Sequence, residues 1–96
     1  MRVTLTSMAE ADVAAALDWY EAEAPGIGIR FLDEFDALLQ RLASNPAQFP
    51  HLRGDVRRAG FPHFPYGLLF RIRHDVVEVF ACFHVSRDPR SWQARR

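Results

Sequence analysis

The chain has 96 residues, enough for one domain spanning residues 1–96, and its 49 % hydrophobic and 25 % charged side chains are typical of a globular protein. No apolar run is long enough to span a bilayer, and the N-terminus lacks a signal-peptide pattern, so we expect a cytoplasmic protein with no membrane association. Its single cysteine excludes an internal disulfide bond.

The net charge of zero conceals two oppositely charged halves. Residues 1–48 carry three arginines and eight acidic side chains, a net charge of −5, whereas residues 49–96 carry nine arginines and four acidic side chains, a net charge of +5. All twelve basic residues are arginine, whose planar guanidinium suits phosphates and carboxylates. A GC-rich genome explains the absence of lysine as well as a binding role does, but it does not explain why acidic and basic residues are separated between the two halves. The second half is therefore predicted to bind anions or an acidic partner.

The N-terminal residues predict a strand followed by a helix. Apolar and polar residues alternate over Arg2 to Thr6, as in a short strand. Ser7 and Glu10 have the spacing of a capping box, so a helix should begin near Met8. Apolar residues then recur at helical spacing until Pro25-Gly26 ends the run.

A second helix should follow at once. Its apolar stripe consists of Phe31, Leu32, Phe35, Leu38, Leu39 and Leu42. Ser44-Asn45-Pro46 is the stop signal. Because the link between the two helices is so short, they are predicted to form an antiparallel helical hairpin.

The next segment is predicted to be a loop and an edge strand. Residues 47–54 should form the loop, which is held in place by burial of Phe49. Val56 to Phe61 is short and bounded by Gly54 and Pro62, which favours a strand at the edge of a sheet.

The two strongest strand patterns run from Tyr66 to Arg73 and from Val76 to His84, with His74-Asp75 between them. They predict an antiparallel hairpin in which the numbers of paired residues sum to 149. One apolar face then carries the pairs Ile72–Val77, Phe70–Val79, Leu68–Ala81 and Tyr66–Phe83. The other face carries Arg71–Glu78, Leu69–Phe80, Gly67–Cys82 and Pro65–His84. The Arg71–Glu78 pair is a cross-strand ion pair, which supports this register.

After the hairpin, Arg87-Asp88-Pro89 should end the sheet and start a short final helix, with Asp88 as its cap and Trp92 packed back on the body. The predicted fold is α+β, with element order β-α-α-β-β-β plus a short C-terminal helix. Its N-terminal helical hairpin covers one face of a small, mostly antiparallel sheet.

Several kinds of site find little support. Cys82 and the histidines show no metal-ligand spacing, Cys82 lies in mid-strand like a core residue, and Gly26 and Gly28 fall short of a phosphate-binding loop, so we expect neither a metal nor a cofactor. The remaining candidate is a cationic face near His84 and Tyr66. Arginines around a histidine would suit RNA cleavage, whereas the alternative is that Glu78 neutralises Arg71 and that His84 only ends a strand.

Taken together, these motifs resemble the RelE/ParE superfamily of type II toxins. The residues that carry the resemblance are Arg57-Arg58, Phe64-Pro65-Tyr66, the hairpin to Phe83-His84, Ser86 to Pro89, Trp92 and Arg95, together with the helical hairpin containing Trp19-Tyr20 and the stop at Asn45-Pro46. The resemblance covers nearly the whole chain. It implies a small bacterial toxin of a plasmid-stabilisation type, neutralised by a cognate antitoxin in a toxin–antitoxin hetero-oligomer.

Two branches of the superfamily imply different activities. The ParE-like branch poisons DNA gyrase by binding, and the RelE-like branch cleaves mRNA on the ribosome, often with lysines. This chain has no lysine, and it has Gly67 where many relatives have an arginine after the tyrosine. Both features favour the ParE-like branch, with the endoribonuclease as the alternative and a non-toxic binding relative as a third reading.

The resemblance also implies candidate site residues. A gyrase-binding surface would consist of Arg57, Arg58, Tyr66, Arg73, Arg87, Arg90, Trp92 and Arg95. A ribonuclease would use His84, Arg71 and Arg87 as catalytic residues.

Overall fold

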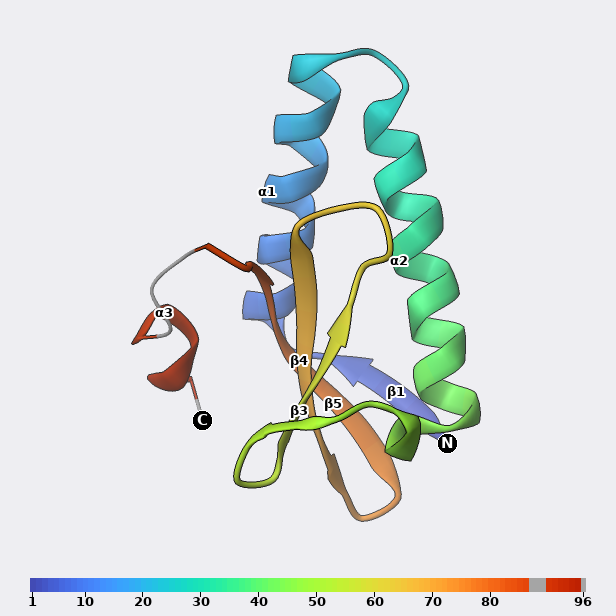
Figure 1. The fold of residues 1–96 in the computed structure, drawn as a ribbon, viewed down its shortest axis with the longest axis vertical. Coiled ribbons are helices and arrows are strands. Elements are labelled where there is room, and N and C mark those ends of the chain that lie inside the picture. Colours follow the sequence, from blue (N-terminus) through green and yellow to red (C-terminus); the bar gives the residue numbers. More distant parts are fainter. Residues whose placement is uncertain (87–89, 96) are drawn as a thin grey trace.

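The computed structural model describes residues 1–86 and 90–95, and in this part of the chain two long helices cover one face of a five-stranded sheet (Figure 1). The helices are α1 (Ser7–Glu23), α2 (Ile27–Ser44) and the short α3 (Arg90–Gln93), with a 3-10 turn at Pro46–Gln48. The strands are β1 (Arg2–Leu5), β2 (His51–Arg53), β3 (Val56–Gly60), β4 (Tyr66–Arg73) and β5 (Val76–His84). They lie in the order β1-β5-β4-β3-β2, and only β1 with β5 is a parallel pair. The α+β prediction is confirmed.

The N-cap of α1 is Thr6, which corrects the capping box predicted at Ser7. The pairing of β1 with β5 continues through the Thr6 N–H, which donates to the Val79 carbonyl at 2.9 Å. Thr6 therefore keeps the extended backbone that an N-cap requires, and its Oγ1 accepts a hydrogen bond from the Ala9 N–H at 3.1 Å. Ser7 is consequently the first residue of the helix.

The turn between α1 and α2 is built as predicted around Pro25-Gly26. Gly26 has φ +92°, a left-handed conformation that glycine adopts without strain. The Glu21 carboxylate accepts hydrogen bonds from the Gly26 and Gly28 N–H groups, both at 2.9 Å, and so caps the positive end of α2. The α2 stripe is narrower than predicted, because Leu32 is 36 % exposed.

The β4–β5 hairpin has the predicted bounds, but its register holds only near the turn. His74 and Asp75 both adopt positive φ (51° and 63°), as a two-residue hairpin turn with primed geometry requires. The pairs from Arg73–Val76 to Phe70–Val79 sum to 149 as predicted. Beyond them a β-bulge shifts the register by one residue, and the pairs are Leu69–Ala81, Leu68–Cys82, Gly67–Phe83 and Tyr66–His84.

This bulge reverses the far half of β5. Because side chains alternate between sheet faces, the shift brings Cys82 into the core beneath the helices and places Ala81 on the opposite face, where Phe83 packs. The predicted faces of Ala81, Cys82, Phe83 and His84 are therefore wrong. The bulge begins where β1 ends, since Leu5 pairs with Val79.

The segment before β3 contains a short strand, β2, that the sequence did not predict. Val56–Gly60 lies between β2 and β4, so it is not the edge strand that was predicted. Burial of Phe49 is confirmed at 6 % exposure. Arg57 supports this loop by donating to the Phe49 carbonyl at 2.6 Å.

A second, smaller core covers the sheet face opposite the helices, which we call the reverse face. It consists of the buried residues Val56, Leu69, Phe80, Ala81 and Trp92, with Phe83 packed against them. The predicted packing of Trp92 is confirmed, with 3 % exposure. The predicted Asp88 cap and Pro89 helix start lie outside the described residues. No helix in the described ranges is long and apolar enough to cross a membrane.

Candidate functional site

The arginines predicted as catalytic or gyrase-binding residues have different environments. Arg71 forms the predicted ion pair, with its Nε 3.2 Å from Glu78 Oε1. It is nevertheless only 7 % exposed, and its guanidinium lies 4.7 Å from the centroid of the Phe80 ring. Arg71 therefore completes the core of the reverse face and offers little surface to a ligand.

Arg58, Arg73 and Arg90 remain as surface arginines. Arg58 is half-buried and lies across Gly67, where a Cβ atom would stand 3.4 Å from its Nε. Arg73, at the turn end of β4, and Arg90, on α3, are exposed. Gly67 and Arg73 are six residues apart in β4, about 20 Å along the strand, so the Arg58 side chain and Arg73 lie near opposite ends of β4. Arg87 lies outside the described residues.

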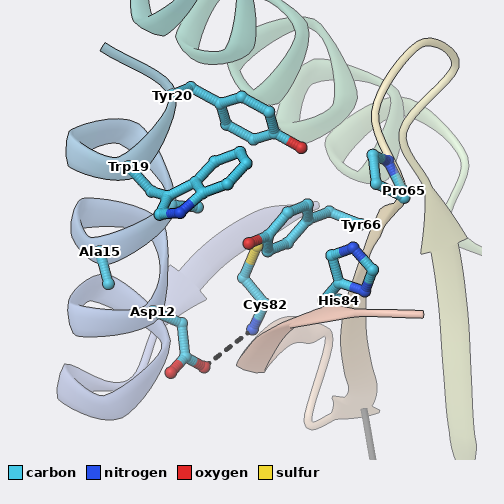
Figure 2. Close-up of a pocket in the computed structure, with 9 residues that line it drawn as sticks. Asp12, Ala15, Trp19, Tyr20, Pro65, Tyr66, Cys82 and His84 are labelled. Atoms are coloured by element: carbon cyan, nitrogen blue, oxygen red, sulfur yellow. Dashed lines mark hydrogen bonds between the residues drawn. The ribbon is translucent and has the colours of Figure 1, made fainter. Parts of the chain in front are cut away.

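A pocket of about 620 Å³ lies between α1 and the ends of β4 and β5 (Figure 2). Its walls come from α1 and from the β4–β5 end of the sheet, namely Asp12, Ala15, Ala16, Trp19, Tyr20, Pro65, Tyr66, Cys82 and His84. The His84 ring meets Tyr66 edge-on at 5.3 Å between centroids, and Trp19 meets Tyr20 in the same manner at 5.0 Å. The pocket is therefore walled mainly by aromatic rings.

The bulge explains why His84 lines this pocket. His84 was predicted to share a sheet face with Arg71, but it lies toward the helices, whereas Arg71 packs on Phe80 of the reverse face. His84 Nδ1 accepts a hydrogen bond from the Ser86 N–H at 3.1 Å. The structure thus separates two of the three predicted catalytic residues, and the third, Arg87, lies outside the described residues.

Tyr20 gives the pocket a titratable group with a shifted pKa. Burial raises the pKa of the Tyr20 phenol, with smaller contributions from Tyr66 and Cys82. A raised pKa means that the folded state holds the phenol proton more tightly than the unfolded state. This contribution to stability is full below the ordinary tyrosine pKa of about 10 and is lost as the pH rises through the folded value.

We therefore expect Tyr20→Phe to reduce the loss of stability at alkaline pH. Urea unfolding followed by circular dichroism, from neutral pH to about pH 11, measures this, because the variant should have the flatter profile above pH 10. Equal slopes for wild type and variant would show that Tyr20 does not titrate in this range.

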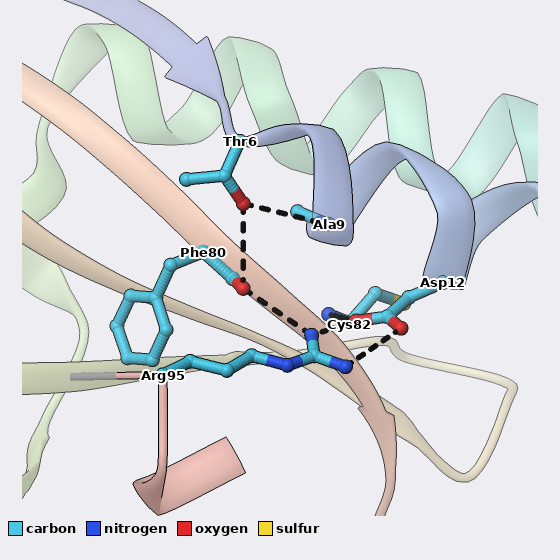
Figure 3. A network of polar contacts seen from close by, with 6 residues as sticks. All are labelled: Thr6, Ala9, Asp12, Phe80, Cys82 and Arg95. Carbon is cyan, nitrogen blue, oxygen red and sulfur yellow. Dashed lines mark hydrogen bonds and ion pairs between the residues drawn. The ribbon is translucent and has the colours of Figure 1, made fainter.

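Asp12 and Arg95 were not predicted to interact, yet they form a network of polar contacts at this site (Figure 3). The Asp12 carboxylate accepts hydrogen bonds from both Nη groups of Arg95 and also from the Cys82 N–H, the last at 3.0 Å. Arg95 Nη1 lies 3.4 Å from the Phe80 carbonyl, and the hydrogen bond to Asp12 raises the pKa of Arg95. The contact joins α1, β5 and the C-terminal segment, so Arg95 has a structural role.

Sequence reasoning also missed the pocket itself. Trp19 is 57 % exposed beside the half-buried Tyr20, and this adjacent aromatic pair on a helix was the one local signal. Among the described residues, no three His, Cys, Asp or Glu side chains are grouped so that they could hold a metal ion.

Known proteins include a family and a solved structure that this chain resembles. A family model described as "ParE toxin of type II toxin-antitoxin system, parDE" matches residues 3–89. A solved chain from a chromosomal ParDE system of P. aeruginosa superposes with a TM-score of 0.77 at 19 % sequence identity, covering 88 % of this chain and 95 % of that chain. At this identity the superposition shows the shared fold. No curated protein matches the chain.

Proposed function

The chain belongs to the ParE toxin family of type II toxin–antitoxin systems, and from this membership we propose that it arrests bacterial growth by binding and poisoning DNA gyrase. A cognate antitoxin encoded beside it would neutralise the toxin in a hetero-oligomer. The observation that carries the proposal is the family match over residues 3–89. The proposed mode of action is binding, with no bond made or broken.

The charge of the C-terminal half supports this proposal. Residues 49–96 have a net charge of +5, and Arg58, Arg73 and Arg90 reach the surface. We assign gyrase contact to these three arginines and to Arg87. Arg57, Arg71 and Arg95 would support this surface through their contacts with the protein, as would the buried rings of Tyr66 and Trp92.

One observation favours the alternative, an mRNA endoribonuclease. His84 and Tyr66 lie side by side in a pocket whose volume of about 620 Å³ is larger than a nucleobase. Against it, Arg71 lies on the reverse face, so stabilisation of a developing phosphate charge would depend on arginines other than Arg71.

Two assays with the purified chain separate these functions. We expect inhibition of DNA supercoiling by gyrase and intact mRNA in a reconstituted translation reaction. Arg73→Glu should weaken gyrase inhibition by about tenfold or more, because it reverses an exposed charge at the proposed contact. Arg30→Glu, an exposed arginine on α2, is the matched control and should change inhibition less than about twofold. Normal gyrase activity together with mRNA breaks would replace this proposal with the endoribonuclease.

A further inference from the structure

Helix α1 has apolar residues on two of its sides, and only one of these two sides is buried. Ala9, Val13 and Ala16 face the core. A second row at the same helical spacing is exposed to solvent and consists of Met8, Ala11, Ala15, Trp19 and Ala22. We call this row the outer stripe. Met8 is 52 % exposed and Trp19 is 57 % exposed, values typical of a helix face that lacks its partner.

The outer stripe continues into the aromatic pocket. Ala15 and Trp19 belong to both features, as Figure 2 shows for the side chains of α1 that border the pocket. The two alanines between Met8 and Trp19 leave a shallow surface on which another helix can lie close. A helix seated there would place side chains of its own at the pocket entrance.

The charge around the outer stripe indicates what kind of helix can bind. Helix α1 carries the acids Glu10, Asp12, Asp18, Glu21 and Glu23, and residues 3–29 contain no basic side chain. Two copies of α1 packed against each other would therefore juxtapose like charges, which disfavours a second copy of this chain. A partner with basic residues beside an apolar row would be complementary.

We propose that the outer stripe binds an amphipathic helix of the antitoxin that carries arginine or lysine beside its apolar row, and that one of these basic side chains enters the aromatic pocket. This inference rests on the proposed function, because it takes the partner to be the antitoxin. The pocket suits a cation, since its lining includes the aromatic residues Trp19, Tyr20 and Tyr66, whose rings can bind a positive charge, and α1 is acidic. Only the antitoxin helix that binds α1 needs basic residues. The arginine-rich half of the toxin favours acidic segments elsewhere in the antitoxin.

The test is the affinity of the protein encoded in the adjacent reading frame for purified variants of this chain. Ala11→Glu puts a charge in the middle of the stripe and should weaken binding by about tenfold or more. Ala37→Glu makes the same change on the exposed side of α2 and should alter binding less than about twofold. Asp18→Arg should also weaken binding, while Asp33→Arg on α2 serves as its control. Ala11, Ala37, Asp18 and Asp33 are all exposed, so thermal unfolding should be nearly unchanged.

A double-mutant cycle tests the pocket. Trp19→Ala should weaken binding, and removal of one particular arginine or lysine of the partner should have no further effect in that background. Unchanged affinity with Ala11→Glu and Asp18→Arg would overturn the proposal, as would tighter binding with Asp18→Arg. Association of the chain with itself that Ala11→Glu abolishes would assign the stripe to a second copy instead. Failure of the wild type to inhibit gyrase would refute the proposed function while leaving these binding results intact.

Discussion

Replacing Phe31 by alanine is expected to lower the free energy of unfolding by about 3 to 5 kcal/mol. Phe31 is fully buried on α2, where it stacks on Phe61 at 4.8 Å between centroids and on Tyr20 at 5.4 Å, and meets Phe64 and Tyr66 edge-on. Its removal leaves a cavity that four aromatic rings cannot fill by small shifts. A domain of this length has a total stability of roughly 5 to 14 kcal/mol, so one substitution would remove a large share of it.

The same substitution should also disturb the pocket, because Tyr20 and Tyr66 are both in contact with Phe31. Urea unfolding monitored by circular dichroism gives the free-energy change. Leu32→Ala is the matched control, since Leu32 is adjacent on the same helix but 36 % exposed, and it should cost less than about 1 kcal/mol. Similar losses for the two variants would show that the aromatic cluster does not determine stability at this position.

The sequence predicted the elements well where a local pattern determines them. The helical spacing of the Phe31 stripe and the apolar runs on either side of His74-Asp75 each specify one element and its approximate ends. The register near the turn was also predictable, because the Arg71–Glu78 pair and the turn length agree on it. These features depend on residues close together in the chain.

The predictions were wrong at positions whose structure depends on contacts with residues far away in the sequence. The bulge near Val79 follows no sequence pattern, yet it moved His84 away from Arg71 and into the pocket. Thr6 became the cap of α1 because β1 pairs in parallel with β5, a contact between the two ends of the chain. The pocket could not be predicted because its walls come from α1 and the β4–β5 end of the sheet, and their approach depends on the whole fold.

The contact between Asp12 and Arg95 leads to the second large expected effect. Beyond Leu5, no strand in the described part of the chain pairs with β5 on the β1 side, and side chains form hydrogen bonds with the β5 backbone there. Asp12 accepts from the Cys82 N–H, while Thr6 and Arg95 reach the Phe80 carbonyl at 3.5 and 3.4 Å (Figure 3). Asp12 and Arg95 are both about 20 % exposed, so the pair is only partly screened by solvent.

Asp12→Ala is therefore expected to cost about 1.5 to 3 kcal/mol, because it removes the partner of a half-buried guanidinium and of a strand N–H together. The asparagine of Asp12→Asn can still accept the hydrogen bond from the Cys82 N–H, so this variant should lose less stability than Asp12→Ala. The difference between the two variants separates the contribution of the strand N–H from that of the Arg95 ion pair. Asp18→Ala, an exposed acid on the same helix, is the control and should stay within about 0.5 kcal/mol of the wild type.

Trp92 reports on α3 in a Trp19→Phe background, since loosening of the C-terminal segment would expose its ring and shift its fluorescence to longer wavelength. Wild-type fluorescence and stability in Asp12→Ala would mean that packing of Trp92 on Phe80 and Phe83 alone holds this segment on the sheet.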